Sequence, residues 1–374
     1  MIIIICAFIL RIILTVYNIQ IDYLPGGDLD ALNFHKEALK YSEYLDLRSG
    51  LIGGENEYEI LWWFSVYMGY FYNFLGTESH LFSSIFSCCI WLLSAVFVRE
   101  IAIKLDFKKT GMNIAIALYC IGFPISIIYT SMTLRETTLL FCFNLLALLM
   151  INIYKAKKIK TIIFNIVSIL CLVIVFLPLH NANIFFAGLY IVLLMSYYVI
   201  HRFKLKYLFL TASAILLIGY LEYSGHLAYV HQSIINYQKG HMYGGQTPRA
   251  HYYPLTYFTN MNINFIEFFM HTSNNIFRYF FEPTLLKVNG FNDLTLFYEN
   301  TLRIVLAFFV ITKLRLKFDN KVIFIVLLLM TMTMELIYSQ VTVNYGTASR
   351  HHVPIMGIWI LLGCFPFRKV AENK

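Results

Sequence analysis

Ionisable side chains crowd one short stretch near the start of the chain, LPGGDLDALNFHKEALKY at residues 24–41. It holds Asp28, Asp30 and His35 within eight positions. The part after Asp30 has helical spacing, and either aspartate would cap that helix. A carboxylate held there would also serve as a general base toward an acceptor hydroxyl, with His35 in support. The residues alone leave capping and catalysis open.

A second candidate is YTSMTLRETTLLF at residues 129–141, where Arg135 and Glu136 precede an apolar run. Ionisable residues at the head of a membrane span are costly and often functional. A planar guanidinium suits phosphate. An interfacial salt bridge between the two side chains is the structural alternative.

A third candidate is NYGTASRHHVPIM at residues 344–356, with Arg350, His351 and His352 in a row. Adjacent histidines do not share a helix face, which makes a poor metal site. An arginine beside an imidazole could bind a phosphate and transfer a proton. An interfacial anchor is the alternative.

The composition places these clusters in a membrane protein. The chain has 374 residues, of which 59% are hydrophobic and 13% charged, and its mean hydropathy is +0.65. Soluble domains carry about 25% charged residues. We expect one all-α polytopic domain over residues 1–374, with about ten spans. They are predicted at 2–19, 81–98, 111–130, 136–154, 161–178, 184–200, 207–222, 300–314, 321–339 and 354–367.

The net charge of +8 does not indicate a nucleic-acid partner. The distribution of the basic residues instead predicts how the chain is oriented in the membrane. Basic residues lie between apolar runs, as expected of cytoplasmic loops. The basic stretches all fall on the cytoplasmic side if residues 57–76 form an aromatic helix at the membrane interface instead of a span. Both termini are then cytoplasmic. The basic stretches are 99–109, 155–160, 201–206, 313–321 and 367–369.

The same topology predicts three extracytoplasmic segments, at 21–80, 223–299 and 340–353. The large middle loop is rich in Tyr, His, Asn and Gln, which suits a carbohydrate platform, and it adds Arg249 and Arg278 as phosphate candidates. Its histidines are scattered, so a metal site has little support. The seven cysteines lie in apolar runs and are interpreted as core residues.

The order of these features resembles the GT-C superfamily of polytopic glycosyltransferases. An acidic outer loop after the first span leads to an aromatic helix, YEILWWFSVYMGYFYNFLGTESH at 58–80, which takes the place of the family's PPLYY…FG helix but lacks its prolines. The turn FPISIIYTSMTLRETTLL at 123–140 is the counterpart of its SP…SR turn. Within that group, the Arg135–Glu136 pair and GTASRHHVP look most like bacterial Wzy-type O-antigen or capsular polysaccharide polymerases. The likeness covers residues 1–155 and, locally, 344–354.

The resemblance implies an enzyme that polymerises undecaprenyl-diphosphate-linked repeat units at the periplasmic face of the bacterial inner membrane. Arg135 and Arg350 would hold the diphosphate. Asp28, Asp30, His351 or His352 would be the base. It implies no cofactor, leaves a divalent metal open, and suggests a flippase and a chain-length regulator as partners, with no nucleic acid.

Two other functions remain open. One is transfer of a single sugar from a polyprenyl-phosphate donor to lipid, glycan or protein. The other is transport of a lipid-linked sugar, although transporters usually show internal repeats and charges buried along a pathway. A purely structural membrane subunit would not need its acids and histidines gathered on one face.

Overall fold

The structure is a computed structural model, which describes residues 1–21, 24, 30–46, 63–176, 179, 265–314, 320–342 and 345–365. All secondary structure in these ranges is helical, and no strand occurs within them. The expectation of an all-α chain is therefore confirmed for the described residues.

The described helices of the first half follow one another closely, with gaps after α1 and α2. They are α1 (Ile2–Gln20), α2 (Asp30–Asp46), α3 (Trp63–Leu75), α4 (His80–Lys104), α5 (Lys109–Ile121), α6 (Pro124–Thr130), α7 (Arg135–Lys155) and α8 (Ile159–Phe176). The second half contributes α12 (Phe265–Phe281), η2 (Leu285–Lys287), α13 (Phe291–Leu314), α14 (Lys321–Val341), α15 (Tyr345–His352), η3 (Val353–Ile355) and α16 (Met356–Gly363).

Five helices, α1, α4, α7, α13 and α14, are long and apolar enough to cross a membrane. The pair α5 and α6 meets the same criterion when taken together, with a bend of 62° at its break. The chain is thus a helical membrane protein. Of the other expected spans, 161–178 overlaps the shorter apolar helix α8, and 354–367 overlaps η3 and contains the eight-residue α16. The expected spans 184–200 and 207–222 lie outside the described residues.

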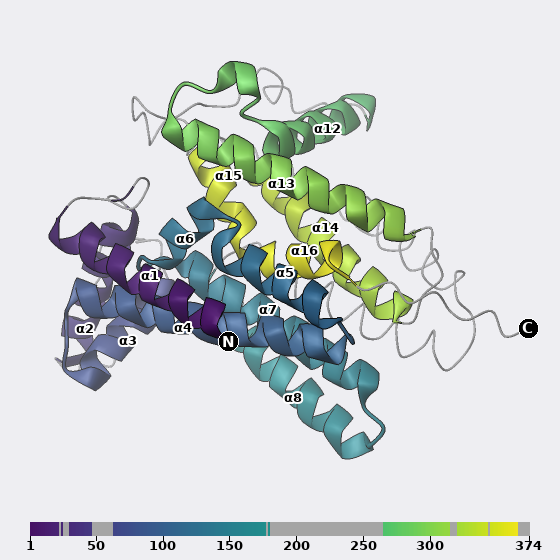
Figure 1. Cartoon of the computed structure of the whole chain (residues 1–374). Coiled ribbons are helices and arrows are strands. Elements are labelled where there is room, and N and C mark those ends of the chain that lie inside the picture. Colours follow the sequence, from purple (N-terminus) through teal and green to yellow (C-terminus); the bar gives the residue numbers. More distant parts are fainter. Residues whose placement is uncertain are drawn as a thin grey trace, which may run out of the picture.

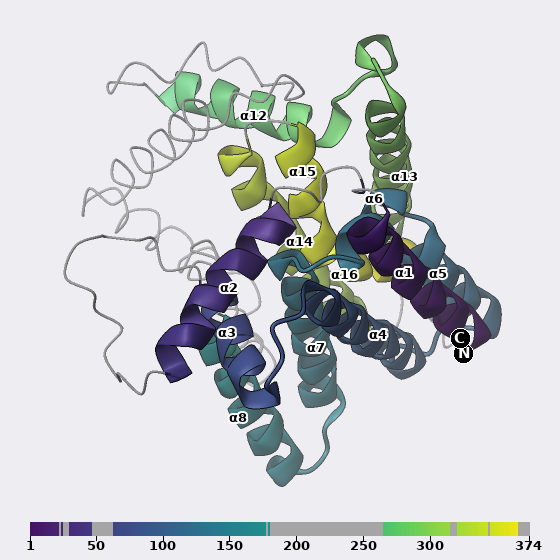
Figure 2. The same cartoon turned by 90° about the vertical axis from the view of Figure 1, so that its left-hand side faces the viewer.

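Helix α7 packs against α4 and α8 (Figures 1 and 2) and also against η3. Close approach is possible because small residues lie at the contacts. A Cβ added at Gly357 of α16 would lie 2.5 Å from Oδ1 of Asn144 in α7. The buried Asn144 amide in turn donates to Ser94 Oγ of α4 at 2.7 Å, so a polar contact joins these helices inside the bundle.

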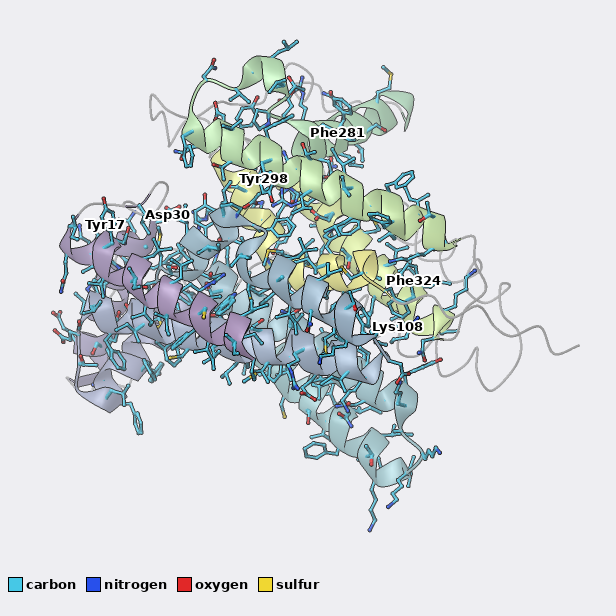
Figure 3. The ribbon with its side chains drawn as sticks, viewed as in Figure 1. Tyr17, Asp30, Lys108, Phe281, Tyr298 and Phe324 are labelled. Carbon is cyan, nitrogen blue, oxygen red and sulfur yellow. The ribbon has the colours of Figure 1, made fainter. Side chains whose placement is uncertain are left out.

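The helix ends that carry lysines meet at one end of the bundle, here called the basic end. Lys155, the last residue of α7, pairs with Asp106 after α4 at 3.2 Å. Phe365, after α16, contacts Phe107 and Phe324 with ring centroids 5.9 and 5.1 Å apart. Figure 3 shows Lys108 and Phe324 toward one side and Tyr17 and Asp30 on the other. The end that carries Asp30 is called the site end.

Helices α2 and α3 form a tight pair beside the bundle (Figure 2). The helix expected after Asp30 is present as α2, with Asp30 as its first residue. Gly69 of α3 allows the contact, because a Cβ there would lie 2.8 Å from the carbonyl oxygen of Ala38 and 2.7 Å from Cβ of Tyr41. The described part of α3 has 13 residues, too short to span a bilayer. Its interfacial position stays a prediction.

Candidate functional site

Arg350 lies near the end of α15, a helix labelled in Figure 1, and its ion pair with Asp30 places it at the site end of the bundle. Pro354 follows shortly after, and because proline lacks an N–H it cannot continue the helix. The chain therefore leaves α15 through η3 and enters α16. Helix α15 is tied to α6, since the hydroxyls of Tyr129 and Ser349 are hydrogen-bonded at 2.9 Å.

Four charged residues from three separate segments meet here: Asp30 of α2, Arg135 and Glu136 of α7, and Arg350 of α15. We call them the ion cluster. Arg350 Nη1 donates to Asp30 Oδ2, and its Nη2 donates to Glu136 Oε1 at 2.9 Å. Arg135 Nε lies 3.5 Å from the same Glu136 oxygen. The three candidate stretches of the sequence thus meet at one place, each through at least one residue.

Exposure differs sharply within the ion cluster. The Glu136 side chain is 3% exposed and Arg350 15%, whereas Arg135 is 24% and Asp30 42% exposed. The guanidinium of Arg135 lies over the ring of Phe34, 5.9 Å from its centroid. Among the described residues, this guanidinium forms its ion pair with Glu136. The cluster therefore opens to its surroundings through Asp30 and Arg135.

Arg350 stays charged in this setting. Burial alone would lower its pKa, but Glu136 and then Asp30 together raise the pKa above its ordinary value. Within the described residues its Nε and the second Glu136 oxygen have no hydrogen-bond partner. Arg350 is thus a fixed cation held by one buried and one accessible carboxylate.

The turn that presents Arg135 follows α6, the second half of the broken helix α5–α6. The start of α6 is held by a buried acid, Glu299. Helix α6 begins at Pro124, and Glu299 Oε1 of α13 accepts the next N–H, that of Ile125, at 2.6 Å. A carboxylate suits this place, because helix N-termini carry unpaired N–H groups and partial positive charge. Arg303 Nη2 donates to the other Glu299 oxygen at 2.8 Å.

A buried arginine holds the other side of the same break. Arg11 of α1 donates from Nη1 to the carbonyl of Cys120 near the end of α5, and from Nε to Thr130 Oγ1 at 2.8 Å. Its guanidinium carbon lies 3.5 Å from the ring centroid of Trp91. A cation is favourable at a helix C-terminus. Arg11 and Glu299 therefore fix the two helix ends at the break, and α6 leads on to Arg135.

The histidines of α15 face other partners than the ion cluster. His351 Nδ1 is 2.7 Å from Thr342 Oγ1, and its ring stacks on Tyr338 with centroids 4.5 Å apart. His352 contacts Glu335 of α14 through Nδ1 at 3.0 Å. Both imidazoles are buried. They lie on the side of α15 toward α14, whereas Arg350 faces α2 and α7.

His35 likewise lies apart from the ion cluster, on another face of α2. Its Nδ1 is 2.9 Å from the hydroxyl of Tyr72 in α3, and its ring stacks on His80 at 4.8 Å between centroids. Burial lowers the pKa of His35, so the ring is neutral at pH 7. The residue joins α2 to α3 and α4 beneath the site.

The remaining candidates fall elsewhere. Arg278 is on α12 near Tyr345; burial and then Glu282 raise the pKa of Tyr345 to about 12, and Arg278 opposes that shift. Asp28 and Arg249 lie outside the described residues.

The pair Glu299 and Arg303 was not predicted from the sequence. A signal existed, since the two are four positions apart in an otherwise apolar helix and so share one face. Their burial, at 1% and 5% exposure, makes them a structural support for the site rather than an accessible part of it.

Among the described residues, no group of three or more metal-ligating side chains could hold a metal ion. Comparisons with protein-family models, with curated proteins and with solved structures gave no match.

Proposed function

We propose that this chain is a membrane-embedded glycosyltransferase that joins undecaprenyl-diphosphate-linked repeat units into a surface polysaccharide. The observation that carries the proposal is the ion cluster, where a fixed arginine lies between a buried and an accessible carboxylate beside a second arginine. Such a group of charges at the end of a membrane bundle suits a substrate with an anionic head and a lipid tail.

Each residue of the cluster has a distinct part in this proposal. The diphosphate binds Arg135 and Arg350 and displaces Asp30 from Arg350, while Glu136 keeps Arg350 in place. Asp30 then takes the proton of the acceptor hydroxyl. The hydroxyl oxygen bonds to the anomeric carbon, and the sugar–phosphate bond breaks, with its electron pair leaving on the diphosphate. The arginines stabilise the charge that develops there.

His351 and His352 have no part in this step, because their imidazoles are buried against α14. Asp28 and Arg249 remain candidates as a second base and a further phosphate ligand. The orientation with the site end periplasmic and both termini cytoplasmic belongs to the proposal.

The test is the surface-glycan ladder of a strain that lacks this gene. It is complemented with wild type, Arg350→Ala, Arg135→Ala or Asp30→Asn at matched membrane levels. We expect the deletion to leave a single repeat and these variants to restore few or no long chains. Glu37→Gln is the matched control, since Glu37 lies on α2 in an exposed pair with Lys40. Long chains in the deletion strain would refute the polymerase.

Transfer of a single sugar would use the same cluster with a monophosphate leaving group. It predicts that long chains persist in the deletion strain but lack one sugar or one lipid modification. Fewer cations are needed for a monophosphate, so Arg135→Ala would then be milder than Asp30→Asn.

A second candidate, transport of a lipid-linked sugar, is favoured by the broken helix α5–α6 and by the buried ionisable residues Arg11, Glu299 and Glu335. Broken helices and buried charges line pathways in transporters. A transporter defect would leave lipid-linked repeats on the cytoplasmic leaflet and no surface glycan. A polymerase defect would leave single repeats at the surface.

A further inference from the structure

A second buried polar group lies behind the ion cluster, where α14, α15 and α16 meet. It consists of Glu335, His352 and Trp359, which are 0%, 1% and 4% exposed. Trp359 Nε1 donates to Glu335 Oε1 at 2.7 Å, and His352 Nδ1 is hydrogen-bonded to the same Oε1 at 3.2 Å and lies 3.0 Å from Oε2. The hydrogen-bond partners decide where the protons of this group must be.

His352 Nε2 carries a hydrogen. It lies 3.3 Å from the backbone carbonyl of Tyr279 in the last turn of α12. The helical donor for that carbonyl would be the N–H of residue 283, which is a proline and has none. A carbonyl only accepts, so the imidazole must donate from Nε2. His352 thus supplies the hydrogen bond that Pro283 cannot.

A further proton must lie between Nδ1 and Glu335. If His352 is neutral with its hydrogen on Nε2, then Nδ1 is an acceptor and only a protonated Glu335 can donate to it. If Glu335 is ionised, His352 must be an imidazolium. An unpaired carboxylate facing an imidazole lone pair would be costly at this depth.

The surroundings favour the neutral form. Burial and then the charge of Arg303 on α13 lower the pKa of His352, against the effect of Glu335. Among the described residues, the phenol ring of Tyr279 on α12 also packs on the pair, with its centroid 4.1 Å from that of His352. A neutral hydrogen-bonded pair also avoids the desolvation of two separate charges.

We propose that Glu335 is a protonated acid that donates to a neutral His352 and thereby fixes α15 with Arg350 facing Asp30 and Glu136. Glu335 is then a positioning residue on α14, and it acts through His352, which lies two residues along α15 from the cation Arg350. The hydrogen-bond arrangement stands independently of the proposed function; only the effect on chain length rests on it.

The protonation state is tested by infrared spectroscopy of the purified full chain and of Glu335→Gln at neutral pH. We expect the wild type to show one carboxylic-acid carbonyl band that the variant lacks. Loss of carboxylate bands instead would overturn the proposal. The measurement needs no substrate.

Positioning is tested with two substitutions of Glu335 that differ in hydrogen bonding. Glutamine can donate to His352 Nδ1 and accept from Trp359, so Glu335→Gln should keep the wild-type melting midpoint and glycan ladder. Glu335→Ala should lower the midpoint by several degrees and shorten the chains. Equal damage by both substitutions would overturn the proposal.

A double-variant comparison with Arg350 distinguishes a positioning role of Glu335 from a general contribution to stability. Arg350→Gln should lower the midpoint less in Glu335→Ala than in the wild type, because the arginine is already misplaced. Thr331→Val is the control. Thr331 is buried one turn before Glu335 on the same face of α14, and the effect of this substitution on the midpoint should simply add to that of Arg350→Gln. Additivity of Glu335→Ala with Arg350→Gln would refute the positioning role. If no variant alters the ladder, the proposed function fails while the midpoints still decide this inference.

Discussion

At the scale of single residues, the ion cluster combines one fixed and one exchangeable contact on the same guanidinium. Glu136 is almost fully buried and bound to Arg350 Nη2, whereas Asp30 is 42% exposed at its side chain. An incoming anion can replace the exposed carboxylate without removing the buried one. The arrangement can therefore open for a substrate and still hold its arginine.

Arg350→Gln should destabilise the protein more than the double variant Glu136→Gln, Arg350→Gln. Among the described residues, the single change leaves buried Glu136 with the 3.5 Å contact to Arg135 as its remaining ion pair, and breaking a buried pair in this way costs about 3–5 kcal/mol. Removing both charges avoids the uncompensated carboxylate. Thermal unfolding of the purified chain in detergent measures the difference, with Glu37→Gln as control. A double variant less stable than Arg350→Gln would contradict the buried pair.

His35 should make the chain less stable in acid. Burial lowers its pKa below the ordinary 6.5, so the unfolded chain binds a proton more readily than the folded one. The stabilisation is fully present above pH 6.5 and is lost as the pH falls through the lowered pKa. Tyr72 and His80 face the ring, and His352 adds a loss in the same sense.

The His35 effect is isolated by comparing wild type with His35→Gln from pH 7.5 to 5. The difference in melting midpoint between the two should shrink on acidification. A constant difference across this range would show that His35 titrates alike in the folded and unfolded chain.

The sequence singled out three stretches that the structure brings together, but it did not predict which of their side chains meet. Asp30, Glu136 and Arg350 were all candidates, yet Arg350 and Asp30 are 320 positions apart, and no local pattern predicts their contact. His351 and His352 were candidate bases because they follow Arg350 directly in the sequence. Which face of α15 each takes depends on α14, and the structure places both against it.

At the scale of elements, α2 and α3 depend on a close contact at Gly69. We expect Gly69→Ala to push the helices apart, since its Cβ would lie 2.7 Å from Cβ of Tyr41. Overpacking of this kind costs about 1–3 kcal/mol. Because Tyr72 lies one turn along α3, its hydrogen bond to His35 should weaken as well.

The measurement is again thermal unfolding, now with Gly290→Ala as the matched control. A Cβ at Gly290 meets nothing within 4 Å, so that variant should match the wild type. If Gly69→Ala were equally neutral, α2 and α3 would not pack as closely as described.

Hydropathy alone did not predict the break between α5 and α6. Residues 111–130 were predicted as one span, and the pair does pass as one by composition, but it bends by 62° at the break. Pro124 was the local signal for a boundary. The partners that hold the break, Arg11 and Glu299, come from distant helices and could not be assigned from the run itself.

At the scale of the whole molecule, charge separates the two ends of the bundle. Lysines and the Asp106–Lys155 pair gather at the basic end, and the ion cluster lies at the site end. The spans predicted at 2–19, 81–98, 136–154, 300–314 and 321–339 all lie within long helices. Apolar periodicity sufficed for these, because length and hydrophobicity alone specify a spanning helix.

The two ends should face opposite sides of the membrane. Leu286, in the connection between α12 and α13 at the site end, is 97% exposed, and Lys157 is exposed at the basic end. In a background without the seven native cysteines, Leu286→Cys should react with a membrane-impermeant maleimide in spheroplasts. Lys157→Cys should react only after the membrane is opened, because basic loops remain cytoplasmic. The reverse pattern would put the ion cluster in the cytoplasm, where repeat units are not polymerised in the proposed reaction, and would end the assignment.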